Sequence, residues 1–273
     1  MSEQPTIFHI TNHKAGSQWV AEILKHLSPD RFVRPEVNVG HFFEKAIIPG
    51  KIYPTIYVTR PQFEGTLLGG HTPQFYYPTN GMKNFLASAF NRYYFRFRHY
   101  RFQVFVIIRD LRDILVSQYF SFLVSHPVTS KRITNYREVL SAMSKEDGFL
   151  YLLDERMPLE AQIQSSWFPA GQSHEVLVLR FEELLNNEYS AFERIFAYCQ
   201  INVERQKLQD IIVQLSFQKS TGRQPGQEDI SSHLRKGVAG DWKNHFTDEM
   251  KKEFKERFGQ LLIDTGYERS LEW

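Results

Sequence analysis

The sequence predicts an α/β fold, a single domain in which helices flank a central parallel sheet. Short apolar runs typical of buried strands alternate with amphipathic stretches over most of the 273 residues, and this alternation is typical of a parallel sheet covered by helices. Hydrophobic residues make up 42% of the chain, which is enough for a sizeable core. No repeat or low-complexity tract divides the chain, so residues 1–273 are expected to form one domain.

Five segments have the composition of buried strands, being short and rich in apolar residues. These are Thr6–Thr11, Ile52–Thr59, Leu67–His71, Gln103–Arg109 and Glu175–Arg180. Helical spacing of apolar residues predicts helices elsewhere, the first one capped by Ser17. The predicted helices are Ser17–Leu24, Asn84–His99, Leu111–Leu123, Glu182–Tyr198, Glu204–Leu215 and Asp248–Leu262. The polar, Gly- and Pro-marked segment Thr221–Ser232 is expected to be a long loop or lid.

Composition and charge exclude several classes of protein. The net charge of +2 is too small to predict nucleic-acid binding or an anionic membrane by itself. The lone cysteine, Cys199, allows no internal disulfide, which fits a reducing cytoplasm. We expect a cytoplasmic protein, because the N-terminus lacks the features of a signal peptide and no window is apolar enough for a membrane span. The ten histidines show no metal-ligand spacing, and no metal is expected.

The first candidate site is the turn between the first predicted strand and helix, His13-Lys14-Ala15-Gly16-Ser17. A Gly-containing turn at a helix N-terminus directs backbone N–H groups at an anion, and Lys14 adds a positive charge. The order of residues differs from a Walker A loop, in which lysine follows the glycines. The alternative is an ordinary strand-to-helix turn.

The second candidate follows the strongest predicted strand, as Arg109-Asp110-Leu111-Arg112-Asp113 and onward to Ser117. Arg109 at a strand end could hold a phosphate with two hydrogen bonds, and Ser117 lies two helical turns further on. The alternative is a capped helix, with Asp110 as N-cap, Asp113 against the helix dipole and Arg112 solvated.

The third candidate is RKGVAGDWKNHF, residues 235–246. Two adjacent cations, Arg235 and Lys236, precede Gly237, and glycine is favoured where a backbone closely approaches a ligand. The alternative is a glycine-rich turn with surface charges and with Trp242 in the core.

Together the three segments resemble the motifs of the cytosolic sulfotransferases, which use 3′-phosphoadenosine 5′-phosphosulfate (PAPS). NHKAGSQW (12–19) resembles YPKSGTTW, and RDLRDILVSQY (109–119) resembles RNPKDVAVSYY. RKGVAGDWKNHFT (235–247) matches every fixed position of RKGxxGDWKxxFT. The resemblance spans nearly the whole chain and implies a P-loop NTPase-like fold.

The resemblance also implies roles for individual residues. The first loop would hold the 5′-phosphosulfate, the second and third motifs the 3′-phosphate, and aromatic residues the adenine. The implied cofactor-binding residues are Lys14, Ala15, Gly16, Ser17, Gln18, Trp19, Arg109, Ser117, Phe181, Phe217, Arg235, Lys236 and Gly237. The implied catalytic residues are His71 as general base, Lys14 on the leaving oxygen, and Ser117.

Several positions depart from the family pattern. GGHTP (69–73) stands where the family has KTHLP, so Gly69 replaces a lysine near the transferred group. Phe181 replaces a tyrosine, and Asp248 and Lys252 occupy positions of the family's dimer motif, so that dimer contact is not expected.

Sulfuryl transfer proceeds like phosphoryl transfer, by in-line displacement through a loose transition state. Because the sulfuryl group carries less negative charge, lysine and backbone donors can serve without Mg²⁺. The acceptor is expected to be a small apolar or aromatic molecule with a hydroxyl or amine, since several aromatic residues lie in segments that would flank His71. They are Phe42, Phe43, Phe75, Tyr76, Tyr77, Phe120 and Phe122.

Two rival functions remain open at this stage. One is a Mg²⁺-dependent small-molecule kinase with a divergent phosphate loop. The other is a non-catalytic protein that binds a nucleotide or, through the basic and aromatic stretch Arg92–Phe102, RNA. We expect that stretch to be a helix packed on the sheet, with its aromatics inward and its arginines outward.

Overall fold

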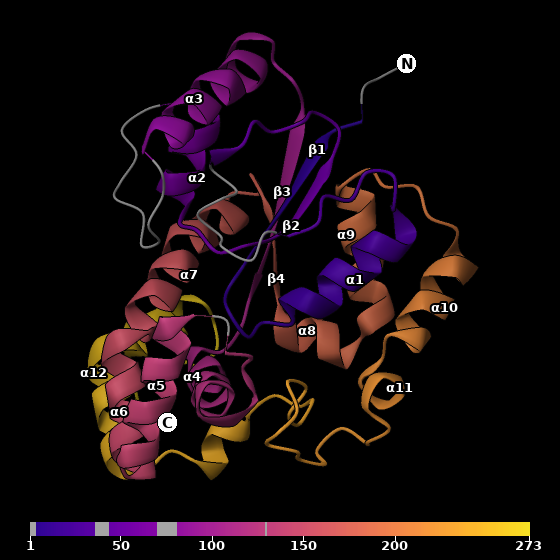
Figure 1. The fold of residues 1–273 in the computed structure, drawn as a ribbon. Helices are drawn as coiled ribbons and strands as arrows, with labels where there is room; N and C mark the ends of the chain where they lie inside the picture. The colour runs from indigo at the N-terminus through magenta and orange to yellow at the C-terminus, as the bar shows by residue number, and fades with distance from the viewer. Residues whose placement is uncertain (1–3, 36–43, 70–80, 129) are drawn as a thin grey trace. The chain divides into compact units, whose positions relative to one another are not determined.

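The structure, a computed structural model, describes residues 4–35, 44–69, 81–128 and 130–273 (Figure 1). Contacts within the chain group it into two compact units. The first unit comprises Met1–Ile108 and Gln162–Leu215, and the second comprises Arg109–Ala161 and Ser216–Trp273. That residues 1–273 form one domain stays a prediction.

The first unit is built on a four-stranded parallel sheet in the order β2-β1-β3-β4. The strands are β1 (Thr6–Thr11), β2 (Ile52–Ile56), β3 (Phe102–Ile108) and β4 (Leu177–Arg180). Thr11 lies opposite Ile107, and Ile108 lies opposite Arg180. Because the strands are parallel, their carboxyl ends share one edge, and the prediction of a central parallel sheet is confirmed.

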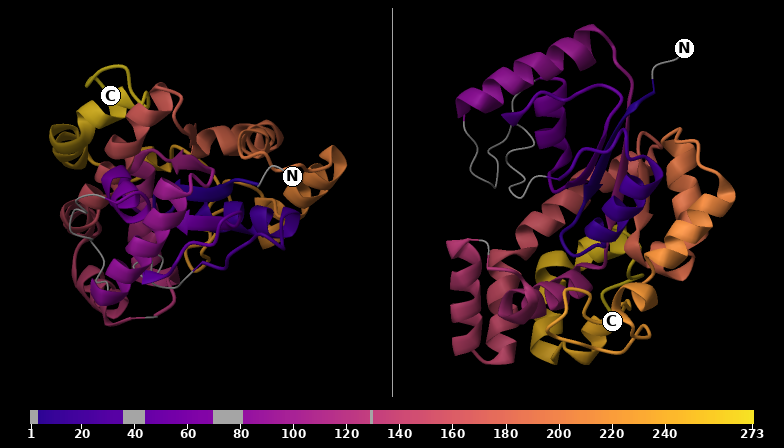
Figure 2. Two further views of the ribbon diagram at one scale, coloured as in Figure 1. Left: turned by 90° about the horizontal axis from the view of Figure 1, so that it is seen from above. Right: turned by 45° about the vertical axis from the view of Figure 1, so that its right-hand side comes forward.

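One face of the sheet is covered by α1 (Ser17–Leu27), α8 (Phe181–Asn186), α9 (Glu188–Tyr198) and α10 (Arg205–Gln214) (Figures 1 and 2). Their apolar side chains form one core with the strands, in which Ile23, Phe192 and Ile195 meet Ile7 and Phe105, all fully buried. The single helix predicted over Glu182–Tyr198 is two helices. Asn187 interrupts it, because its side chain caps α9 by accepting a hydrogen bond from the Ser190 N–H.

The opposite face carries an aromatic cluster. Phe8 of β1 meets Phe63 edge to face at 5.0 Å, and Phe63 meets Trp167 at 5.5 Å. Phe63 lies on α2 (Arg60–Leu67), and Trp167 lies on α7 (Met157–Gln172). The helix α3 (Gly81–Arg92) and a π-helical turn (Tyr93–Phe97) belong to the same side, where Phe95 reaches Phe8 at 6.3 Å.

The strand predicted at Leu67–His71 is wrong in its described part, because Leu67 ends the helix α2. Thr59 and Gln62 form a capping box, in which the Thr59 N–H donates to the Gln62 side chain at 3.0 Å, and a proline stands in the first turn. This start signal turns the chain into a helix just after β2, so β2 ends at Ile56 rather than at Thr59.

The second unit is helical. It contains α4 (Leu111–Phe120), a π-helical turn (Ser121–Ser125), α5 (Lys131–Ala142), α6 (Lys145–Glu155), α11 (Phe217–Thr221), a 3₁₀ turn (Asp241–Asn244) and α12 (Asp248–Asp264). Leu115, Phe149, Trp242 and Phe254 are among the residues of its core. Trp242 is therefore a core residue, as the alternative for the third motif predicted. The predicted loop Thr221–Ser232 is confirmed from Gly222 onward.

Candidate functional site

In the first unit, the turn between β1 and α1 has the geometry of an anion-binding loop. Lys14 and Gly16 both adopt left-handed backbone conformations, with φ of 63° and 73°. Left-handed φ strains a residue with a side chain, so its occurrence at Lys14 points to a functional constraint. Gly16 is the N-cap of α1, so Ser17 is the first helical residue and the prediction that it caps the helix is wrong. With glycine as the cap, the first N–H groups of α1 carry no capping side chain and suit an anion.

The Phe181 ring lies directly behind this loop. A Cβ atom on Gly16 would overlap the Phe181 ring, so any larger residue would displace either the loop or the ring. Phe181 begins α8 immediately after β4. The structure thus brings together two predicted cofactor residues that are far apart in the sequence. The other loop residues also keep their predicted positions: Ala15 is buried, Gln18 is exposed, and Trp19 is half-buried with its ring edge-on to Phe192 at 5.2 Å.

Tyr57 is a residue of this loop that the sequence did not predict. Its hydroxyl lies 2.8 Å from the Ser17 hydroxyl, and its ring stacks on His13 with 3.8 Å between centroids. Tyr57 directly follows β2, the strand paired with β1. The carboxyl ends of neighbouring parallel strands share one edge of the sheet, and this placement was the one available signal.

In the second unit, the second and third motifs are joined to each other. The Arg109 guanidinium donates to the Val238 carbonyl at 3.5 Å. Asp113 lies 3.6 Å from the same guanidinium and accepts from the N–H groups of Gly240, at 2.7 Å, and Trp242, at 3.0 Å. The Asp113 side chain is 1% exposed, so it is a buried clamp that holds Arg109 beside the loop 237–240.

The alternative for the second motif is confirmed in one part and wrong in another. Asp110 caps α4 by accepting from the Arg112 N–H. Arg112, however, is buried rather than solvated, forms ion pairs with Asp110 and Glu268, and lies over the Trp242 ring at 3.9 Å. Ser117 is half-buried on α4. Arg112 is thus part of the second unit's core, and Arg109 stays the predicted ligand-binding arginine of this motif.

Gly237 and Phe217 are brought together in the same way as Gly16 and Phe181. Gly237 has a φ of 66°, and a Cβ atom there would lie 2.6 Å from the Phe217 ring. Arg223 ties the intervening loop down by donating to the Arg235 carbonyl at 2.7 Å. The Arg235 guanidinium lies 4.5 Å from the centre of the Phe120 ring. Predicted residues for the 3′-phosphate and for adenine are thus neighbours in this unit.

Asp241 organises the cations of the third motif. Its carboxylate, on a residue that is 3% exposed, pairs with Arg235 and with Lys236, the latter at 2.6 Å. Burial alone would raise the pKa of Asp241, but hydrogen bonds from His245, Lys236, Arg235 and Asn244 outweigh burial and hold the pKa well below its ordinary value. Arg235 also pairs with Glu228. Asp241 therefore holds both cations in place, and Glu228 also holds Arg235.

Some predicted residues lie outside the described residues. They are His71, Phe42, Phe43, Phe75, Tyr76 and Tyr77. Of the remaining candidates for the acceptor pocket, Phe120 is half-buried and Phe122 is buried. The predicted general base and most of the predicted acceptor pocket therefore stay predictions.

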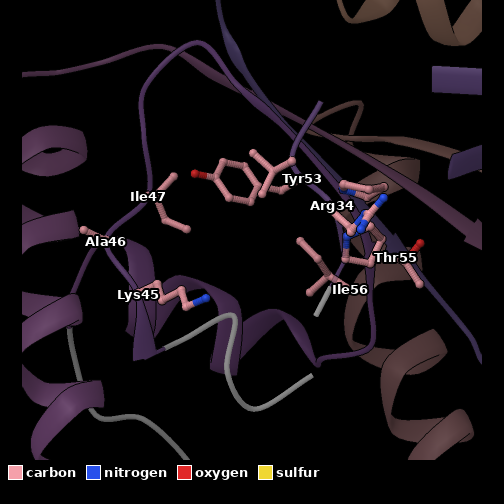
Figure 3. A pocket seen from close by; sticks show the side chains of 10 residues that line it. Arg34, Lys45, Ala46, Ile47, Tyr53, Thr55 and Ile56 are labelled. Atoms are coloured by element: carbon pink, nitrogen blue, oxygen red, sulfur yellow. The ribbon is translucent and has the colours of Figure 1, made fainter. Parts of the chain in front are cut away.

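A small pocket lies in the first unit beside β2, lined by residues that include Arg34, Lys45, Tyr53 and Thr55 (Figure 3). Its volume is about 50 Å³, room for only one or two water molecules. It is therefore too small to be the predicted acceptor pocket, because pockets for small molecules have volumes of about 300–1,000 Å³.

The comparison with known proteins decides the family. The sulfotransferase domain family matches residues 4–266. The chain belongs to the sulfotransferase family. Human sulfotransferase 2A1 is 24% identical over 267 residues, which covers 93% of this chain and 83% of the relative. The guinea-pig 3-alpha-hydroxysteroid sulfotransferase is also 24% identical, covering 94% of this chain and 83% of the relative.

Solved structures agree on the fold. The mouse sulfotransferase SULT7A1 complexed with PAP superimposes with a TM-score of 0.62 at 18% identity, covering 98% of this chain and 87% of that one. A retinol dehydratase in complex with androsterone and the inactive cofactor PAP gives a TM-score of 0.52 at 14% identity, covering 97% and 83%. The predicted enzyme family and fold class are thus confirmed, and sulfotransferases use PAPS.

Two further observations concern what the described residues lack. No helix in residues 4–35, 44–69, 81–128 and 130–273 is long and apolar enough to cross a membrane. Across those same residues, His, Cys, Asp and Glu side chains do not gather in groups of three or more that could hold a metal ion.

Proposed function

We propose that this sulfotransferase transfers the sulfuryl group of PAPS to a hydroxyl or amine of a small apolar or aromatic acceptor. The observation that carries the proposal is the clamp in the second unit. Asp113 and the Val238 carbonyl hold Arg109 against the loop that carries Gly237, so both segments expected to bind a 3′-phosphate are folded as one cluster. An arginine fixed beside backbone N–H groups is suited to recognising a phosphate.

The loop at the start of α1 would hold the 5′-phosphosulfate. Its glycine N-cap and the first N–H groups of the helix direct positive partial charge at an anion, and Lys14 adds a full charge. Ala15, Gln18 and Trp19 continue this loop, with Trp19 and Phe181 beside the adenine. Ser117, Arg235 and Lys236 would add to Arg109 at the 3′-phosphate, and Phe217 would also contact the adenine.

The reaction is an in-line displacement. When bound, PAPS supplies the sulfuryl group, which passes to the acceptor oxygen or nitrogen. His71 takes the proton that the acceptor loses, a role suited to an imidazole whose ordinary pKa is near 6.5 and worth about 10²–10⁴-fold in rate. Lys14 offsets the negative charge that develops on the leaving phosphate oxygen.

The acceptor class is supported by similar proteins and by the aromatic residues of this chain. The solved retinol dehydratase complexes contain androsterone or retinol, both of which are apolar alcohols. Phe120 and Phe122, with the aromatic residues near His71, would form a pocket of that character. We further infer that the protein is cytoplasmic and that residues 1–273 act as one domain.

Calorimetric binding of 3′,5′-ADP and 5′-ADP, with and without Mg²⁺, tests the proposal. We expect a strong, metal-independent preference for 3′,5′-ADP. Binding of ATP only in the presence of Mg²⁺ would favour the kinase instead. Equal affinities for 3′,5′-ADP and 5′-ADP would contradict the proposed 3′-phosphate site.

The Arg235→Ala variant sharpens this test. It should weaken the binding of 3′,5′-ADP by roughly ten- to a hundredfold, the contribution of one or two charge-assisted hydrogen bonds. The affinity for 5′-ADP should stay nearly unchanged. Arg194→Ala is the matched control, because that arginine pairs with Glu183 on the surface of the other unit. Equal weakening of both ligands by Arg235→Ala would contradict the assignment.

A further inference from the structure

The helix α3 and the π-helical turn after it carry an apolar stripe on their outer side. Along 81–97, six large side chains are between 46% and 70% exposed: Met82, Phe85, Leu86, Phe90, Tyr93 and Phe97. Their spacings of three, one, four, three and four residues place them on one helical face. The expectation that the aromatics of Arg92–Phe102 point inward is therefore wrong for Tyr93 and Phe97, whereas Phe95 is buried as expected.

The other side of the same segment is anchored in the first unit. Phe95 is 4% exposed and belongs to the aromatic cluster on the sheet. Asn91 is fully buried and accepts from the Ile47 N–H at 2.7 Å, and Ser88 donates to the Thr66 carbonyl. The helix therefore uses Ala87, Asn91 and Phe95 for its own packing, and the stripe is a second, separate apolar face.

The segment that carries the stripe has charges of one sign. Residues 81–101 contain five cations, Lys83, Arg92, Arg96, Arg98 and Arg101, and no Asp or Glu. Without these five, the chain has 28 cations against 31 acids, a net charge of −3, so the segment is a basic island in an otherwise acidic protein. Arg96, Arg98 and Arg101 are exposed and, within the residues the structure describes, form no ion pair.

We propose that this stripe is a docking surface for an anionic lipid bilayer. A helix with exposed Phe, Leu and Met on one face and cations beside it is suited to lie in the headgroup region, its apolar side chains inserted and its arginines on lipid phosphates. Aliphatic Met82 and Leu86 cannot stack on bases, which disfavours RNA. A second copy would bring two basic segments together, so like charges would oppose pairing through the stripe.

The helix lies on the membrane in this proposal and does not cross it. Docking depends only on the stripe and the cations, and not on the proposed sulfuryl transfer. If that transfer has an apolar acceptor, the bilayer surface is also where such an acceptor accumulates.

The test is sedimentation of the full chain with vesicles of phosphatidylcholine alone or containing phosphatidylserine. We expect binding to the anionic vesicles that weakens as salt increases. Arg96→Gln/Arg98→Gln/Arg101→Gln should reduce binding about a hundredfold, at roughly a factor of five per surface cation. The control Arg194→Gln/Arg205→Gln/Lys207→Gln removes the same charge from exposed positions on α9 and α10 and should bind like the wild type.

A second pair of variants tests the stripe itself. Phe85→Gln/Leu86→Gln should lose vesicle binding, whereas Val213→Gln, an exposed apolar position on α10 that is 58% accessible, should not. Phe85, Leu86 and Val213 are all exposed, so circular dichroism should show both variants folded. Failure of the wild type to bind anionic vesicles, or equal binding by the stripe variant, overturns the proposal.

Two outcomes would identify a different partner and also overturn it. A dimer that becomes monomeric in Phe85→Gln/Leu86→Gln, without vesicle binding, assigns the stripe to a second copy. Salt-sensitive RNA binding without vesicle binding assigns it to nucleic acid. Because no readout uses enzyme turnover, these results are independent of any failure of the proposed catalytic function.

Discussion

Replacing Gly237 with alanine tests whether the loop of the third motif shapes a nucleotide site through Phe217. The substitution has two costs. The φ of 66° is strained for alanine by about 1 kcal/mol. The new Cβ would also lie 2.6 to 2.8 Å from three atoms of the Phe217 ring, against an ordinary contact distance of about 3.5–4.0 Å. The ring must therefore move by roughly 1 Å.

Gly222→Ala is the matched control. Gly222 lies in the same unit with a similar φ of 71°, but a Cβ atom there meets nothing within 4 Å. Both variants should lose about 1 kcal/mol of unfolding free energy from backbone strain. Overpacking adds about 1–2 kcal/mol for Gly237→Ala, toward the low end of the usual range because the Phe217 ring is half-exposed and can yield.

The larger difference should appear in binding. If Phe217 borders the adenine, moving its ring by 1 Å in Gly237→Ala should weaken the affinity for 3′,5′-ADP about tenfold or more. Gly222→Ala should bind 3′,5′-ADP like the wild type. Urea unfolding and calorimetry of both variants measure the two effects. Equal affinities in the two variants would refute a role for the Gly237–Phe217 pair in the site, whatever the stability data show.

Three other predictions follow from the same residues. Tyr57→Phe removes the partner of the Ser17 hydroxyl and should weaken 3′,5′-ADP and 5′-ADP equally, by about five- to tenfold, in calorimetry; a loss for one ligand alone would contradict the assignment to the 5′ side. His71→Ala should keep 3′,5′-ADP affinity and lose about 10²–10⁴-fold in transfer rate, and loss of binding as well would make His71 structural. Asp241→Asn should destabilise the protein by about 3 kcal/mol at neutral pH. Because the folded pKa of Asp241 lies below its ordinary 3.8, the stability it contributes is present above about pH 4 and is lost at lower pH. The difference between wild type and variant in urea unfolding should therefore shrink below pH 4, and a difference that grows there would contradict the ion-pair account.

The sheet could be predicted from sequence because its strands are short apolar runs bounded by polar residues. The expected strands at 6–11, 103–109 and 175–180 agree with β1, β3 and β4 to within two residues at either end. Helix boundaries were harder, since they depend on single capping side chains. Thr59 and Gln62 form the capping box that begins α2 directly after the stretch predicted as a strand. Asn187 divides a stretch whose apolar spacing predicted a single helix. The segment 124–174, for which no element was predicted, contains α5, α6 and α7.

Within the site, the motifs gave the residues but not their partners. Lys14, Gly16, Arg109 and Gly237 occupy the strand-to-helix turns and loops expected of them. The clamp of Asp113 on Gly240 joins residues 127 positions apart, and no local pattern predicts such a contact. For the same reason the alternative for the second motif assigned Asp113 only to the helix dipole and described Arg112 as solvated.

The end of β2 bears most directly on the choice of catalytic residues. His71 was selected because GGHTP resembles the family's KTHLP segment, and a strand was separately predicted at Leu67–His71. The strand beside β1, however, ends at Ile56, and the chain then enters α2. The side chain that this strand delivers to the phosphate loop is Tyr57, in contact with His13 and Ser17. The family pattern has lysine before its histidine, and a tyrosine hydroxyl can replace the hydrogen bond of a lysine but not its positive charge. If Tyr57 stands in for that lysine, charge stabilisation at the phosphosulfate falls to Lys14 and the α1 N-terminus. Lys14→Met should then cost more transfer rate than Tyr57→Phe, and the reverse order would place the tyrosine at the centre of the chemistry.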